Sequence, residues 1–546
     1  MRFWFALLFL LLIASGLIWR MVYLMVLNRD FLLNQSNARV LRVIDIPAYR
    51  GMVVDRNGKP LAVSTPVDSV WINPTQFSAD PQDLTELCRL LGISLIDLQQ
   101  RLQQDPEREF MYLKRRINPA LAAQVKGLSI PGVYLQREYR RYYPEGEIAA
   151  HIVGFTNIDD QGQEGLELAY NEWLRGVPGK KQVIKDRLGH IIANVKVLKE
   201  PQPGHDLTLS IDRRIQYLAY RELKEAVEKY KAASGSVIVV DVKTGEVLAM
   251  VNQPSYNPNN RPQEHDGRYR NRAITDVFEP GSTAKAFSVA NAFMYGNFTP
   301  ETPVNTSPGW MTVEGKVVRD IHNNGAIDVT RVLQKSSNIG VTKLTLAVPP
   351  NTLWNTLHRL GFGQPTAVNF PGESSGFLPF HKNWHPFTLA TLSFGYGFSV
   401  TNLQLVQAYT ILAAHGIKRP LSLLKTDAPK VGEQIIEAKI ARQVLKMLET
   451  VVEEGGGAIR ANVPGYIVAG KTGTVRIVGP HGYDPRRHIG FFVGVAPAAN
   501  PRLAISVMIN DPQSGGYYGG IVAAPVFSKV MAGALRVMEV PPEVQQ

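Results

Sequence analysis

Cysteine is almost missing from this 546-residue chain, in which Cys88 is the only one. A single cysteine excludes an intramolecular disulfide, and its place in the apolar helical pattern of residues 84–91 predicts a small buried side chain. Low-complexity segments and fixed-period repeats are also lacking. The net charge of +12 comes without a long basic run, because the basic residues are scattered or paired, as at Arg140-Arg141. This scatter argues against a nucleic-acid partner and favours an ordinary solvated surface.

Hydrophobic residues make up 45% of the chain, enough to bury sizeable cores, and the length fits more than one domain. We expect an anchor at residues 1–27, a first domain at 28–202 and a second domain at 203–540. The first domain alternates short strand-like runs with helical ones such as 95–102 and holds no catalytic constellation. The second predicts an α/β unit, whose expected elements are a long amphipathic helix at 214–230, a hairpin at 236–251, strands near 489–495 and 503–509, and a closing helix at 523–538.

The N-terminal residues predict a membrane anchor. Residues 3–19 are uncharged, and a second apolar stretch, 21–27, follows Arg20. At about 1.5 Å per residue, a helix over 3–27 would reach about 37 Å, enough to span a bilayer while Arg20 extends toward an interface. The run is longer than the roughly 7 to 15 apolar residues of a cleaved signal peptide, and no clear A-x-A site follows it. The flanking arginines would not assign the orientation by themselves.

Three short motifs stand far apart in the chain, and they are Ser282-Thr283-Ala284-Lys285, Ser336-Ser337-Asn338 and Lys471-Thr472-Gly473-Thr474. The first follows a Glu279-Pro280-Gly281 turn and opens an apolar stretch, which predicts Ser282 at a helix N-terminus with Lys285 one turn on. A serine hydroxyl is a weak nucleophile until a base takes its proton. Lysine can be that base only when neutral, and bringing its pKa from about 10.4 to near 7 costs about 4.6 kcal/mol. We expect burial, or a neighbouring cation such as Lys471, to supply that free energy.

The third motif follows the apolar residues 466–470 and leads into residues 475–478, so it predicts a β-strand, at or near a sheet edge. Strand alternation places Thr472 and Thr474 on one face, where two hydroxyls can bind a substrate carboxylate. Gly473 between them would let a ligand backbone approach closely. Both features suit a peptide substrate.

Two repeats of the motif patterns lack the necessary context. Residues 422–425 repeat S-x-x-K, but they lie in an extended run rather than at the start of a helix. Lys243-Thr244-Gly245 repeats K-T-G in a predicted hairpin turn, where its lysine would only be solvated. We therefore expect neither segment to take part in catalysis.

Two other short patterns resemble a nucleophile elbow and a zincin metal site, but neither has the context that its function requires. Residues 372–376 match G-x-S-x-G, but no helix follows, and a nucleophile elbow requires a strand-to-helix turn. His381 and His385 have zincin-like spacing, yet Lys382 stands where glutamate is required, and Pro386 argues against a continuous helix. We expect no metal site there.

S-x-x-K, S-x-N and K-T-G together form the motif set of penicillin-binding proteins and class A β-lactamases, and the chain resembles the class B high-molecular-weight penicillin-binding proteins. The likeness covers nearly the whole chain, and the segments that carry it besides the motifs are Arg50–Arg56, Tyr142–Pro144, His151–Thr156, Gly162–Glu167, Phe394–Gly397 and Tyr517–Gly520. Glu279 is typical of the division-specific type, because elongation-specific relatives usually have proline there. The resemblance implies an α/β penicillin-binding transpeptidase fold, an antiparallel sheet flanked by helices, preceded by an elongated α+β pedestal of dimerisation type and one transmembrane helix.

The resemblance also implies a two-step acyl transfer on the D-Ala-D-Ala end of a peptidoglycan stem peptide. Ser282 would be the nucleophile, Lys285 the base for acylation, and Ser336 the relay to the leaving amine. Asn338 would hold the substrate amide and help position Lys285, while Lys471 would tune Ser336 electrostatically.

Thr472 and Thr474, with Gly473 between them, would bind the terminal carboxylate. The backbone N–H groups of Ser282 and Thr474 would form the oxyanion hole, and β-lactams would acylate the same serine. No metal ion or other cofactor is implied. The expected partners are stem peptides, β-lactams, a glycan polymerase of the FtsW type and other division proteins. The expected location is the bacterial inner membrane, with one span and a periplasmic catalytic domain.

Three other functions stay open at this point. An elongation-specific transpeptidase would use the same chemistry. A penicillin-binding sensor or scaffold would keep the fold without cross-linking any peptide. A class A β-lactamase would need an E-x-x-x-N glutamate, and none of the glutamates between the second and third motifs has asparagine four residues on.

Overall fold

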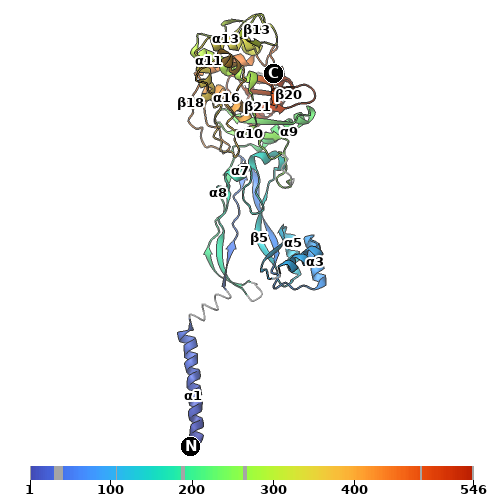
Figure 1. Cartoon of the computed structure of the whole chain (residues 1–546), viewed down its shortest axis with the longest axis vertical. Coiled ribbons are helices and arrows are strands. Elements are labelled where there is room, and N and C mark those ends of the chain that lie inside the picture. The colour runs from blue at the N-terminus through green and yellow to red at the C-terminus, as the bar shows by residue number, and fades with distance from the viewer. Residues whose placement is uncertain are drawn as a thin grey trace. The chain divides into compact units, whose positions relative to one another are not determined.

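The computed structural model describes residues 2–29, 41–105, 107–185, 191–261, 267–479 and 482–543. The chain forms two compact units. The first unit comprises Met1–Gly51, Ser64–Arg141 and Trp173–His205, and the second comprises Met52–Val63, Tyr142–Glu172 and Asp206–Gln546. Figure 1 draws both, coloured along the chain. Because each unit takes several segments, the chain passes between them more than once.

The N-terminal segment is helical, as predicted. Helix α1 (Arg2–Val22) continues as a π-helical turn, η1 (Tyr23–Leu27). Among the described residues, Arg2–Leu27 is the one helix long and apolar enough to cross a membrane, with a mean hydropathy of 2.2 and no part buried in the protein. The Arg20 guanidinium lies 5.4 Å from the ring centroid of Tyr23, so the side chain lies along the helix toward its C-terminal end.

The first unit contains two sheets. In one, β1 (Leu41–Ile46) pairs antiparallel with β6 (Gly179–Lys185), which pairs with β7 (Ile191–Lys199). In the other, β3 (Pro60–Ile72), which begins in the second unit, pairs with β4 (Met111–Ile117) and β5 (Val133–Tyr142).

Three helices share one hydrophobic core with β3 and β4, and they are α3 (Pro81–Leu91), α4 (Leu95–Gln104) and α5 (Pro119–Gly127). Capping defines where two of them begin, because the side chains of Ser94 and Asn118 accept hydrogen bonds from backbone N–H groups in the first turns of α4 and α5. Cys88 on α3 is buried in this core, as the sequence predicts.

An antiparallel five-stranded sheet forms the centre of the second unit, in the order β10-β9-β21-β20-β19. The strands are β9 (Ser234–Asp241), β10 (Val247–Gln253), β19 (Ala469–Gly479), β20 (Gly482–Ala496) and β21 (Leu503–Asn510). Every residue of β9 and β10 is buried, as expected for strands covered on both faces. Helices α9 (Arg213–Lys229) and α19 (Ala524–Val537) pack on each other and on the sheet, and α16 (Asn402–Ala413) also contacts the sheet.

The other elements of the second unit are short helices and strands that surround this sheet. They are β2 (Val53–Val54), η2 (Gly146–Ile148), α6 (Ala150–Val153), α7 (Gly165–Ala169), α8 (Asn171–Leu174, which ends in the first unit), β8 (Leu207–Thr208), α10 (Arg272–Thr275), β11 (Val277–Phe278), η3 (Gly281–Ala284), α11 (Lys285–Tyr295), β12 (Pro303–Asn305), β13 (Trp310–Val313), β14 (Lys316–Arg319), β15 (Ala326–Asp328), α12 (Val329–Gln334), α13 (Asn338–Leu346), α14 (Thr352–Leu360), α15 (Pro386–Ser393), β16 (Val400–Thr401), β17 (Ile417–Lys418), β18 (Glu433–Gln434), α17 (Ala438–Glu449), η4 (Ile459–Ala461) and α18 (Gly519–Val522).

The segments that only mimic the motifs lie where the sequence predicts. Lys243-Thr244-Gly245 forms the turn between β9 and β10. Ser422 lies in extended backbone and makes an isolated bridge with Glu246. Residues 372–376 are a loop, and His385 precedes Pro386, which is the first residue of α15. Neither the nucleophile elbow nor the zincin helix is present at these positions.

Candidate active site

The nucleophile candidate Ser282 lies on a tight turn held by backbone contacts. It belongs to the 3-10 helix η3, and the α-helix α11 begins only at Lys285. The N–H of Gly281 donates to the carbonyl of Gly395 at 2.9 Å. A side chain at Gly395, whose φ is +86°, would place its Cβ 2.0 Å from the oxygen of Gly281. Glycine is therefore required at position 395 for the backbone of the Ser282 turn to approach so closely.

Lys285 joins the first motif to the second. Its side chain is 1% exposed, on a helix whose residues 285–293 are all buried. The ammonium donates to the carbonyl of Ser336 at 2.5 Å and to its Oγ at 3.1 Å. Among the described residues, no hydrogen bond joins Ser282 Oγ to this amine, as is common before a substrate tightens catalytic hydrogen bonds.

Two causes lower the pKa of Lys285, the direction that a lysine base requires. Burial lowers the pKa of Lys285 well below its ordinary value, and the charge of Lys471 lowers it further. The carboxylate of Asp320 opposes part of this effect. Lys471 itself is 1% exposed, and burial lowers its pKa to about 8. The three motifs therefore meet, because Lys471 acts on Lys285 and Lys285 contacts Ser336.

Asp320, which the motif analysis missed, holds the second motif. It follows β14, and its two carboxylate oxygens accept hydrogen bonds from Ser337 Oγ at 2.5 Å and from the N–H of Ile339 at 3.0 Å. Ser337 also caps α13. No spacing or motif marks Asp320 in the sequence, because its role depends on a hairpin folding back onto the start of α13.

The side chain of Asn338 is held by the end of β14. Its side-chain amide donates to the carbonyl of Arg319 at 2.9 Å. No hydrogen bond among the described residues joins Asn338 to Lys285, and Ser336 contacts that amine instead. Ser336 adopts a φ of +57°, which turns both its carbonyl and its hydroxyl toward Lys285. Any contact of Asn338 with substrate remains a prediction.

The third motif lies on β19, which is an edge strand of the sheet, as predicted. Thr472 and Thr474 alternate onto one partly buried face, and Thr474 Oγ1 accepts a hydrogen bond from the N–H of Gly519 at 3.0 Å. The space beside Gly473 is filled from within the sheet, because a Cβ there would lie 2.0 Å from the ring of Phe491. Glycine at this position thus serves the packing of β20 against β19, and the predicted close approach of a ligand is not its structural cause.

Tyr409 contacts the turn that carries Ser282, and it is a second residue that no motif marks in the sequence. Its side chain on α16 is fully buried, and its hydroxyl donates to the carbonyl of Thr283 at 3.0 Å. The Thr283 hydroxyl in turn donates to the carbonyl of Pro280 at 2.6 Å. These bonds brace the residues on both sides of Ser282. The sequence offers no signal for Tyr409, since a tyrosine in an apolar helix is usually a core residue.

We expect Tyr409→Phe to slow acylation by penicillin about fivefold, because losing one buried hydrogen bond of roughly 1 kcal/mol loosens the turn that carries the nucleophile. The measurement is the second-order rate constant of labelling by a fluorescent penicillin. The matched control is Tyr256→Phe, which removes an equally buried hydroxyl that donates to the carbonyl of Ala150 at 3.0 Å. Equal rates in the two variants would contradict a positioning role for Tyr409.

We expect Lys471→Met to make the protein more stable while removing activity. A lysine whose folded pKa is about 8 instead of 10.5 is costly to fold in its charged form, by about 3 kcal/mol at pH below 8. Stability should therefore rise with pH between 8 and 10.5 in the wild type, and this slope should be shallower in the variant, where the lowered pKa of Lys285 still contributes. Thermal unfolding of the full chain in detergent at pH 6 to 10 measures it. Lys446→Met, at an exposed lysine paired with Glu449, is the control and should not stabilise.

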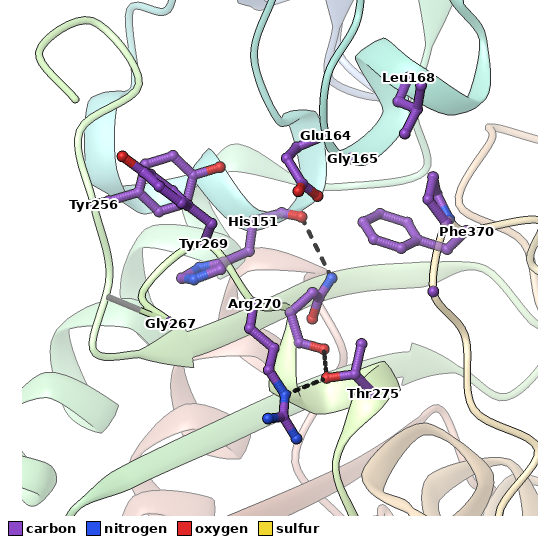
Figure 2. Close-up of a pocket in the computed structure, with 13 residues that line it drawn as sticks. His151, Glu164, Gly165, Leu168, Tyr256, Gly267, Tyr269, Arg270, Thr275 and Phe370 are labelled. Atoms are coloured by element: carbon purple, nitrogen blue, oxygen red, sulfur yellow. Dashed lines mark hydrogen bonds between the residues drawn. The ribbon is translucent and has the colours of Figure 1, made fainter. Parts of the chain in front are cut away.

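A cavity of about 530 Å³ is a second candidate site in the second unit. Figure 2 shows the rings of Tyr256 and Phe370 on opposite sides of it. Of its charged side chains, Arg270 forms an ion pair with Asp276 at 2.6 Å. Burial lowers the pKa of His151 to about 4, so its ring is neutral at pH 7. None of the motif residues lines the cavity, and its described lining holds no serine or cysteine nucleophile.

Comparison with known proteins agrees with this geometry. Residues 235–532 match the family model of the penicillin binding protein transpeptidase domain, and residues 45–209 match that of the penicillin-binding protein dimerisation domain. The chain is 45% identical over 540 residues to peptidoglycan D,D-transpeptidase FtsI of Escherichia coli strain K12, which covers 98% of this chain and 91% of the relative. It is 44% identical over 524 residues to the probable peptidoglycan D,D-transpeptidase PbpC of Pseudomonas aeruginosa, covering 96% of this chain and 93% of the relative.

A solved structure is similar over most of the chain. Penicillin binding protein 3 from Mycobacterium tuberculosis, complexed with aztreonam, superposes with a TM-score of 0.72 at 26% identity, over 92% of this chain and 98% of that one. The fold class and the resemblance inferred from the sequence are therefore confirmed.

Proposed function

Since this chain belongs to the penicillin-binding protein transpeptidase family and is of the FtsI type, we propose that it is a serine peptidoglycan D,D-transpeptidase of septal cell-wall synthesis. The observation that carries this function is the contact of Lys285 with Ser336 beneath the Ser282 turn, with Lys471 lowering the pKa of the same amine. A buried lysine with a lowered pKa, beside a serine at a helix start, is an arrangement that can activate a hydroxyl nucleophile.

In the proposed acylation step, Ser282 Oγ attacks the carbonyl carbon between the two D-alanines of a donor stem peptide. Lys285 takes the hydroxyl proton, and Ser336 passes a proton to the nitrogen of the leaving D-alanine as the peptide bond breaks. In the second step, an amine of a neighbouring stem peptide attacks the acyl-enzyme ester and releases Ser282. The balance is one peptide bond broken and one formed, so no external energy source or redox partner is needed.

The remaining motif residues would bind the donor. Thr472 and Thr474 supply hydroxyls on one face of an edge strand, which suits the terminal carboxylate, and Asn338 would hold the substrate amide. The N–H groups of Ser282 and Thr474 would stabilise the oxyanion. Preorganised donors of this kind are typically worth about 2.7 to 4 kcal/mol each in the transition state. β-Lactams would acylate the same hydroxyl.

The location and partners follow from the same family. The apolar helix Arg2–Leu27 would anchor the chain in the inner membrane, with its N-terminus in the cytoplasm and both units in the periplasm, where the substrate lies. Large domains translocate largely regardless of flanking charge, so the arginines after the helix do not oppose this orientation. A glycan polymerase of the FtsW type and other division proteins are the proposed partners.

The deciding experiment incubates the full chain with a synthetic stem pentapeptide donor and an amine-bearing acceptor, followed by mass spectrometry. Cross-linked dimers with release of D-alanine support the proposal. Hydrolysed tetrapeptide without dimers would indicate a carboxypeptidase, and no product at all would indicate a sensor or scaffold. A septal rather than elongation role requires that the chain restores division in Escherichia coli cells depleted of FtsI.

A further inference from the structure

One carboxylate, that of Glu279, connects three segments around the nucleophile. Glu279 lies between β11 and η3, three residues before Ser282. Its Oε1 accepts a hydrogen bond from the N–H of Gly397 at 2.9 Å. The Tyr483 hydroxyl lies 3.0 Å from Oε1 and 2.8 Å from Oε2 of the same carboxylate. The segment leading to the nucleophile is therefore bound to the loop of residues 394–397 and to the β19–β20 hairpin.

The neighbours of Glu279 contact the same hairpin nearer the centre of the sheet. The ring of Phe278 lies 5.0 Å from that of Phe491 on β20, measured between centroids. A Cβ at Gly281 would lie 2.7 Å from the side chain of Val475 on β19, so the two backbones are in close contact there. Glu279 reaches further out, to Tyr483, the second residue of β20.

That outer end is weakly supported by the rest of the fold. The pairing of β19 with β20 shifts register between Arg476 and Val478. Such a bulge bends and twists the strand that carries it, so the hairpin beyond it departs from the sheet. The side chains of Val478 and Tyr483, which pair across the hairpin, are 62% and 47% exposed. With so little burial, the hydrogen bonds to Glu279 have a large share in fixing this end.

The chemistry of the contact is suited to a fixed link. Burial and the Glu279 carboxylate both raise the pKa of the Tyr483 hydroxyl, so it stays protonated and donates at neutral pH. A hydroxyl donating to a carboxylate makes a stronger bond than a neutral pair. The Tyr396 ring, 6.2 Å from that of Tyr483, covers the link on one side.

We propose that Glu279 is a positioning residue that fastens the β19–β20 hairpin to the nucleophile turn, so that Thr472 and Thr474 are held at a fixed distance from Ser282. This inference rests on the proposed function, in which those threonines bind the donor carboxylate while Ser282 attacks. Without the link, the outer hairpin swings on the bulge at Arg476, and the strand end that carries Thr474, two residues before that bulge, loses its fixed distance from the nucleophile. Breaking the link weakens the non-covalent binding of the ligand that precedes acylation. The acylation step itself is unaffected, because neither Lys285 nor Ser336 has a described contact with Glu279 or Tyr483.

The experiment measures acylation of the full chain in detergent by a fluorescent penicillin at several concentrations, which separates the dissociation constant of the first complex from the acylation rate constant. Tyr483→Phe removes only the hydroxyl and leaves Glu279 bonded to Gly397. We expect the dissociation constant to rise about tenfold, the effect of losing roughly 1.4 kcal/mol of a hydrogen bond to a charged group, with the acylation rate constant unchanged.

Three further variants make the test specific. Glu279→Ala should raise the dissociation constant as well, and adding Tyr483→Phe to it should have no further effect, because the two residues act as one link. Glu279→Gln keeps an oxygen that accepts both hydrogen bonds and should retain most of the affinity. The matched control is Tyr220→Phe, which removes another tyrosine–carboxylate bond of this unit, from Tyr220 to Glu147 at 2.5 Å, and should leave both constants unchanged.

Two results would overturn the proposal. Acylation constants of Tyr483→Phe equal to those of the wild type would mean that the hairpin is held without the link. A tenfold loss of affinity in Tyr483→Phe that recurs when Glu279 is already alanine would mean that the hydroxyl acts through a group other than Glu279. Failure of the wild type itself to form an acyl-enzyme would instead contradict the proposed function, so the two failures are distinguishable.

Discussion

Replacing Ser282 with alanine is expected to abolish covalent labelling by fluorescent penicillin, and to abolish dimer formation from stem peptides. The variant lacks the only atom that can form the acyl ester, so the loss should be at least about 10⁴-fold rather than partial. The side chain is small and partly buried, and its hydroxyl makes no hydrogen bond within the described residues. Folding should therefore be preserved, as thermal unfolding of the variant will show.

Ser422→Ala provides the control for that experiment, because Ser422 starts the second S-x-x-K sequence in the chain. Its hydroxyl donates to the carbonyl of Leu424 at 2.7 Å, and its carbonyl accepts from the N–H of Val247 at 2.9 Å. These are structural bonds, so labelling should match the wild type even if the protein unfolds at a lower temperature. Persistent labelling of Ser282→Ala, or its loss in Ser422→Ala, would contradict the assignment of the nucleophile.

Replacing Lys285 with glutamine is expected to slow acylation by a factor of about 10² to 10⁴, the usual contribution of a positioned general base. Glutamine keeps most of the side-chain length and can still donate to the carbonyl of Ser336, but it cannot accept the proton of Ser282. Lys425→Gln is the matched control, because this lysine ends the second S-x-x-K sequence and its amine only donates to the carbonyl of Arg56 at 3.1 Å.

The pH profile of the wild type gives a second measure of the same base. Lys285 must be neutral, so acylation should rise with pH through its lowered pKa and reach full rate far below the ordinary lysine pKa of 10.5. It should fall again above pH 8, because Lys471, with a pKa of about 8, then loses the charge with which it would tune Ser336. A rate that keeps rising toward pH 10, or a Lys285→Gln variant that acylates like the wild type, would exclude Lys285 as the base.

The local parts of the site could be predicted because their signals lie within a few residues. A turn before an apolar run placed Ser282 at a helix start, and apolar residues on both sides of Lys471 predicted a strand. The same context separated the motifs from their repeats at Ser422 and Lys243. The long helix α9 and the hairpin β9–β10 were predicted within a few residues for the same reason, since periodicity and turn signals are local properties.

Two expectations were changed by side chains that come from other parts of the chain. Gly473 is required by the ring of Phe491 on the neighbouring strand. Asn338 donates to a carbonyl at the end of β14, while Ser336 contacts Lys285 in its place. Neither neighbour can be inferred from the residues beside the motif, because strand pairing and loop packing join segments that are distant in sequence.

By itself, the sequence determined the helix and strand that present the three motifs and the family to which such a set belongs, and it predicted which residues carry the chemistry. Only the tertiary structure decided how those residues are tuned and held. Burial sets the pKa of Lys285, and Asp320, Tyr409 and the link from Glu279 to Tyr483 hold the catalytic segments in place. The physical reason is the distance over which each effect acts. Turn and periodicity signals act over a few residues of sequence, whereas desolvation and hydrogen bonding depend on whichever groups the fold brings within a few ångströms.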